Sequence, residues 1–151
     1  MIETVSPRQA AVATVVRVLV VFETVAFLLA ALLHLGERVP VGFAVLATDR
    51  ILPAAIVEGL AALVFAVSAY AVFTRTTWAW SVAIVAHAFA LAGVLLGMWA
   101  IAAGFGPHSV LNDTYHRVML VMLVAGLALL STPSARAALG RGKSSSQRET
   151  V

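Results

Sequence analysis

Five ionisable side chains lie inside stretches of this sequence that are otherwise apolar: Glu23, His34, Glu58, His87 and His116. The clearest case is Glu58, which lies in the segment PAAIVEGLAALVF and is its one charged residue. Burying a carboxylate or an imidazole among apolar side chains costs free energy unless a partner compensates it. Ionisable residues in such segments usually face one another and belong to a functional site. These five residues are therefore the candidates for chemistry.

The segments that hold these residues have the length and composition of membrane spans. The chain of 151 residues is 62% hydrophobic and 11% charged, whereas about a quarter of the residues of a soluble domain are charged. About 20 helical residues cross a bilayer, and four apolar segments reach that length: 14–35, 53–73, 78–101 and 112–130. None shows the period-2 alternation of a β-barrel. The sequence predicts an all-α integral membrane protein, an antiparallel four-transmembrane-helix bundle.

The basic residues near the span ends give the expected orientation, because cytoplasmic loops are the richer in Lys and Arg. Three of the ten, Arg38, Arg50 and Arg117, flank one side of the bundle, and seven flank the other. Both termini are therefore expected in the cytoplasm, with the apolar loop 36–52 and the loop 102–111 outside. The transmembrane domain would cover residues 1–135, and 136–151 would be a basic, disordered cytoplasmic tail. A bacterial inner membrane is the expected location.

Three of the ionisable residues lie at one depth when the helical rise is applied to the predicted spans. His34 ends the first span, Glu58 is near the start of the second and His116 near the start of the fourth, so all lie within about 8 Å of the outer boundary. Two imidazoles and a carboxylate suit zinc or iron, and nearby methionines would favour copper. Asp113, one turn before His116, could be a fourth ligand or orient an imidazole. A haem b held by His34 and His116 is an alternative, and so is a hydrogen-bonded cluster that only joins helices.

The other two residues, Glu23 and His87, form a second layer about 13 Å deep, near the middle of the membrane. A carboxyl group and an imidazole at that depth could be a proton relay, or could bind the ring oxygens of a quinone. The alternative is a single buried hydrogen bond. Alanines surround Glu58, His34 and His87 at helical spacing, and small residues mark the faces where membrane helices approach closely. Both layers are therefore expected inside the bundle.

The resulting functional prediction is a small membrane redox or metal-binding protein. A non-catalytic accessory subunit of a larger membrane complex is one alternative, and an oligomeric transporter or proton-relay element is another. The expected partners are the lipid bilayer and further copies or subunits. Scattered basic residues give no case for nucleic acid, and the absence of cysteine excludes thiolate metal sites. No catalytic motif is present, so catalysis is left open.

Overall fold

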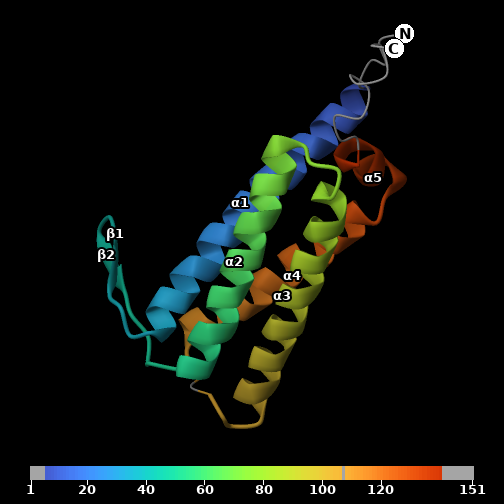
Figure 1. The fold of residues 1–151 in the computed structure, drawn as a ribbon. Coiled ribbons are helices and arrows are strands. Elements are labelled where there is room, and N and C mark those ends of the chain that lie inside the picture. Colours follow the sequence, from blue (N-terminus) through green and yellow to red (C-terminus); the bar gives the residue numbers. More distant parts are fainter. Residues whose placement is uncertain (1–5, 107, 141–151) are drawn as a thin grey trace, which may run out of the picture.

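The computed structural model describes residues 6–106 and 108–140 and is mostly helical (Figure 1). A short hairpin follows the first long helix, and a short helix follows the last. The elements are α1 (Pro7–His34), β1 (Val39–Val41), β2 (Ala44–Leu46), α2 (Leu52–Thr74), α3 (Ala79–Ala102), α4 (Val110–Leu130) and α5 (Pro133–Leu139).

The four long helices are long and apolar enough to cross a membrane, which confirms the four helices expected from the sequence. Three of them begin and end within two residues of the predicted spans. The first differs, because α1 begins at Pro7 and not near residue 14. Ser6 caps it: its hydroxyl accepts from the Gln9 N–H, and the Gln9 side chain accepts from the Ser6 N–H. This capping box starts the helix before the apolar run does.

Neighbouring long helices pack side by side in chain order, and their connections alternate between the two ends of the bundle (Figure 1). The first turn of α1, the α2–α3 connection and α5 lie at one end, here called the α5 end. The end of α1, which is His34, the β-hairpin and the α3–α4 connection lie at the other, the hairpin end. The centre is filled by fully buried residues such as Phe65, Met119 and Leu123. Apolar residues such as Val121, which is 68% exposed, cover the outside, as expected of helices surrounded by lipid.

The connection between α1 and α2 contains a β-hairpin that the sequence did not lead us to expect. Its strands pair antiparallel, with Val39 opposite Leu46 and Val41 opposite Ala44. Gly42 begins the two-residue turn with φ +59°, a conformation that glycine adopts without steric cost. Phe43, the other turn residue, is completely exposed. The apolar character of this loop was noticed in the sequence, but its strand pairing was not.

Helix α5 folds back on the bundle and packs against α1. Its Ala135 and Leu139 are buried. The Arg136 guanidinium lies 4.9 Å from the centre of the Trp80 ring, and the Trp80 indole N–H donates to the Leu130 carbonyl oxygen at 2.9 Å. The bundle therefore continues through residue 139. The rest of the predicted tail, residues 141–151, lies outside the described residues.

Candidate functional site

His34 and Glu58 form a buried pair where the end of α1 meets the beginning of α2. The His34 Nδ1 and Glu58 Oε2 atoms are 2.6 Å apart, and the two residues are 4% and 6% exposed. The backbone joins the same two helices, because the Ile51 N–H donates to the His34 carbonyl oxygen at 2.8 Å. Glu58 is thus compensated directly by an imidazole, as its place in an apolar segment required.

His116 approaches the same region from α4, and its tautomer is defined by its surroundings. Its Nδ1–H donates to the Asn112 carbonyl oxygen at 2.9 Å. A neutral ring then has its lone pair on Nε2. This atom lies over Gly97 of α3, where an added Cβ would come within 2.5 Å of it. Gly97 therefore makes room for the acceptor nitrogen of His116.

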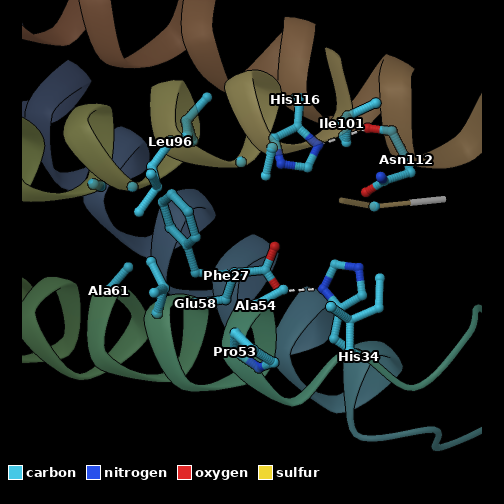
Figure 2. A pocket seen from close by; sticks show the side chains of 18 of the residues that line it. Phe27, His34, Pro53, Ala54, Glu58, Ala61, Leu96, Ile101, Asn112 and His116 are labelled. Atoms are coloured by element: carbon cyan, nitrogen blue, oxygen red, sulfur yellow. Dashed lines mark hydrogen bonds and ion pairs between the residues drawn. The ribbon is translucent and has the colours of Figure 1, made fainter. Parts of the chain in front are cut away.

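A cavity of about 260 Å³, here called the Glu58 pocket, lies between these polar groups. Figure 2 shows His116 and Asn112 on one side of it and Glu58 with His34 on the other. The second oxygen of the Glu58 carboxyl group points toward the side of His116. The rest of the lining is almost entirely apolar, and it includes the exposed residues Leu96 and Phe105. The pocket therefore reaches the surface of the bundle.

The proposed metal ligands are not gathered into one group. Among residues 6–106 and 108–140, no three His, Asp or Glu side chains stand close enough together to hold a metal ion. His34, Glu58 and His116 line the same pocket, but the direct contact is between the first two. Asp113 does not line it. Its carboxylate lies 3.8 Å from His108 Nδ1, near the surface.

Glu23 and His87 do meet, in the centre of the bundle, and are here called the inner pair. The His87 Nε2 and Glu23 Oε2 atoms are 3.3 Å apart, and both residues are 0% exposed. The His87 Nδ1–H donates to the Ala83 carbonyl oxygen at 2.8 Å. The contact between the pair is not aligned as a hydrogen bond. Within the described part of the chain, the two Glu23 oxygens and His87 Nε2 have no hydrogen-bond partner. Gly126 of α4 lies directly against the His87 ring.

Two aromatic residues, Phe27, which lines the Glu58 pocket, and Phe65, which contacts His87, lie between the two polar sites and are here called the aromatic layer. The Phe27 and Phe65 rings stack with centres 5.7 Å apart, and Tyr115 meets Phe27 edge-on at 6.4 Å. Phe65 also contacts the His87 ring, at 5.0 Å. The two polar sites therefore share a wall of aromatic rings.

Two residues of the site were missed in the sequence. Asn112 fixes the His116 tautomer through its carbonyl oxygen. Together with His34, Asn112 lines both the Glu58 pocket and a second cavity of about 130 Å³, which lies between α1, α4 and the hairpin. Tyr115 also lines the second cavity. The sequence contained no signal for Asn112, because the atom that His116 contacts is a backbone carbonyl oxygen, which every residue has. It contained no signal for Tyr115 either.

The fold and the site together define a small membrane protein of four apolar helices with a polar-ended pocket between them. Comparisons with protein-family models, with curated proteins and with solved structures found no match to this chain. The function has to be argued from the chemistry of the pocket.

Proposed function

We propose that this chain is a small membrane redox protein whose Glu58 pocket binds a ring-shaped, mostly apolar molecule with hydrogen-bonding oxygens, of the quinone class. The observation that carries the proposal is the 260 Å³ cavity with a carboxyl group at one side and an imidazole nitrogen at the other. A cavity of about 150 Å³ accommodates benzene, so this one has room for a substituted ring.

The lining supports this class of ligand. Apolar walls favour a ring that arrives from lipid, and a few polar groups fix its orientation, as in most small-molecule pockets. The Glu58 carboxylate and the neutral His116 Nε2 are both acceptors, so they suit the two hydroxyl groups of a reduced quinone. Imidazole and carboxyl groups can also exchange protons with those hydroxyls. His34 would hold the carboxylate in place during this exchange.

The proposal includes the antiparallel arrangement in a bacterial inner membrane, with the α5 end in the cytoplasm and the Glu58 pocket toward the outer face. The distribution of basic residues supports it: Arg8, Arg75 and Arg136 lie at the α5 end. The chain has no cysteine, so single cysteines at Phe43 and Thr77 can be labelled in intact cells. We expect an impermeant maleimide added outside to label position 43 and not position 77. Labelling of position 77 and not of position 43 would mean that the chain has the opposite orientation in the membrane.

Binding is tested with purified protein in detergent and a short-chain ubiquinone analogue, in oxidised and reduced form, measured by quenching of tryptophan fluorescence. We expect saturable binding of the reduced form. Glu58→Gln should weaken it about tenfold or more, because a hydrogen bond to a charged group is lost. Glu23→Gln is the matched control, since it makes the same change outside the pocket.

Two results would contradict the proposal. One is the absence of saturable binding in protein that is folded by circular dichroism. The other is a stoichiometric metal ion, found by elemental analysis, that Glu58→Gln or His116→Gln removes. That second result would instead support the metal-binding interpretation of the same residues. Loss of co-purifying subunits in Glu58→Gln, without any binding of quinone, would support an accessory subunit.

A further inference from the structure

The inner pair is a second candidate site, and its chemistry does not depend on what occupies the Glu58 pocket. His87 Nδ1 must carry a hydrogen, because its partner is the carbonyl oxygen of Ala83. A neutral His87 therefore presents a lone pair on Nε2 to Glu23 Oε2, 3.3 Å away. Two acceptors at that distance repel each other unless one of the two groups carries a proton. The pair needs one proton in addition to the one on Nδ1.

The burial of the inner pair decides which atom holds this proton. Both residues are 0% exposed. In such surroundings, moving the proton from the carboxyl group to the imidazole would create two buried charges, which costs more free energy than keeping both groups neutral. The separation of 3.3 Å is also longer than the roughly 2.7–2.9 Å of a charge-assisted hydrogen bond. A protonated Glu23 facing a neutral His87 fits both observations.

Further buried polar atoms lie level with the inner pair or between it and the α5 end. Ser68 lies ten residues after Glu58 on α2 and Glu23 eleven before His34 on α1. Since His34 and Glu58 are in contact, Ser68 and Glu23 lie at about the same level. The Ser68 hydroxyl, Arg17 Nε and the Thr76 hydroxyl are buried without a hydrogen-bond partner in the described residues, and so is the Tyr115 hydroxyl on the other side of the aromatic layer. Internal water usually satisfies such groups. Arg17 and Thr76 lie at the α5 end.

Toward the Glu58 pocket, the inner pair meets the aromatic layer. Phe27 and Phe65, 2% and 0% exposed, stack between the inner pair and the Glu58 pocket. Phenyl rings have no groups that bind or pass a proton. The charged or titratable groups that could influence the pair are Arg17 on α1, Arg136 on α5, and Glu58 and Tyr115 beyond the aromatic layer. Ser68 of α2 and Gly126 of α4 do not titrate.

We infer that Glu23 and His87 form a site that stores one proton, exchanged with the α5 end of the bundle and not with the Glu58 pocket. The proton resides on the Glu23 carboxyl group and is accepted by His87 Nε2 when it moves. The two polar sites of the molecule would then communicate with opposite faces of the membrane.

Infrared spectroscopy of the purified protein tests where the proton resides. We expect the C=O stretch of a protonated carboxylic acid at neutral pH, shifted in D₂O, lost completely in Glu23→Gln and kept in Glu58→Gln. Glutamine can donate an N–H to His87 Nε2, so this variant should fold, as circular dichroism would verify. A wild-type spectrum without this band, or a band that persists in folded Glu23→Gln, would overturn the assignment.

Sidedness is tested in liposomes whose protein orientation is known from the cysteines at positions 43 and 77. Raising the pH only in the compartment that faces the α5 end should remove the carboxylic acid band. Raising it only in the compartment that faces the hairpin end should leave the band unchanged. Loss of the band from the hairpin side, or from neither side, would overturn the proposed route. Neither experiment requires a ligand in the Glu58 pocket, so the inference can fail while the quinone proposal stands.

Discussion

The two carboxyl–imidazole pairs of this chain are built from the same residue types but differ in their access to other molecules. Glu58 and His34, with their atoms 2.6 Å apart, adjoin a cavity of about 260 Å³. Glu23 and His87, with their atoms 3.3 Å apart, are 0% exposed and enclosed by packed helices. One pair can meet a ligand, whereas the other can exchange little more than a proton. The surroundings, more than the residue types, therefore assign the chemistry.

The largest expected difference is in the cost of removing each histidine. His87→Ala should lower the free energy of unfolding by about 3 kcal/mol or more, because it leaves a cavity and a buried Glu23 without a partner. His34→Ala should lower the free energy of unfolding by only about 1–2 kcal/mol, since solvent or lipid headgroups can reach Glu58 through the pocket. Chemical unfolding in detergent, followed by circular dichroism, measures both. Val85→Ala, on the exposed face of α3, is the control.

If the two histidine variants lowered the free energy of unfolding equally, the proposed difference between the two pairs would be wrong. Such a result would mean that the Glu58 pocket closes around His34 in the membrane as tightly as the helices close around His87. A large cost for the Val85→Ala control would instead point to a helix contact on the outside of the bundle.

The next difference concerns the two glycines that lie against histidine rings. A Cβ at position 126 would fall on His87 Nε2 and approach Leu19 Cδ2 to 3.0 Å. The His87 ring is fully buried, so Gly126→Ala should lower the free energy of unfolding by about 1–3 kcal/mol. A Cβ at position 97 would approach His116 Nε2 to 2.5 Å, but this ring can turn into the cavity. Gly97→Ala should change stability by less than about 1 kcal/mol.

Ligand binding distinguishes the same two variants in the opposite sense. Gly97→Ala should weaken binding of the reduced quinone analogue, because the displaced His116 ring fills part of the Glu58 pocket. Gly126→Ala should leave that binding unchanged in protein that remains folded. If both variants bind normally, His116 is not part of the ligand site.

Much of the fold follows from the sequence because lipid imposes a simple rule on it. Backbone polar groups must be satisfied within each span, so a long apolar segment has to be a helix. This is why α2, α3 and α4 are predicted within two residues of their observed ends. The hairpin between β1 and β2 follows no such rule. Its pairing depends on the turn at Gly42 and on contacts across the chain that a short apolar loop does not reveal.

Depth within the membrane predicted two of the contacts between polar residues, but not what lies between the others. The helical rise placed Glu23 level with His87 and Glu58 level with His34, and the structure brings each pair together. It also grouped His116 with Glu58 and His34, and Asp113 was added because it lies one turn before His116. A calculation of depth does not include rotation about the helix axis, so it could not reveal that a cavity separates His116 from Glu58. It also could not reveal that Asp113 points to the surface.

Replacing Asp113 should have the smallest effect on stability, and it tests directly whether Asp113 lies outside the Glu58 pocket. Its carboxylate lies 3.8 Å from His108, which is exposed, and Asp113 itself is half-buried, so Asp113→Asn should lower the free energy of unfolding by no more than about 0.5 kcal/mol. Binding of the quinone analogue and any metal content should also stay the same. Loss of either in Asp113→Asn, with His108→Gln unaffected, would mean that the first turn of α4 rotates toward the Glu58 pocket when a ligand binds. The pocket would then have two acidic groups, and a metal ion would become its better occupant.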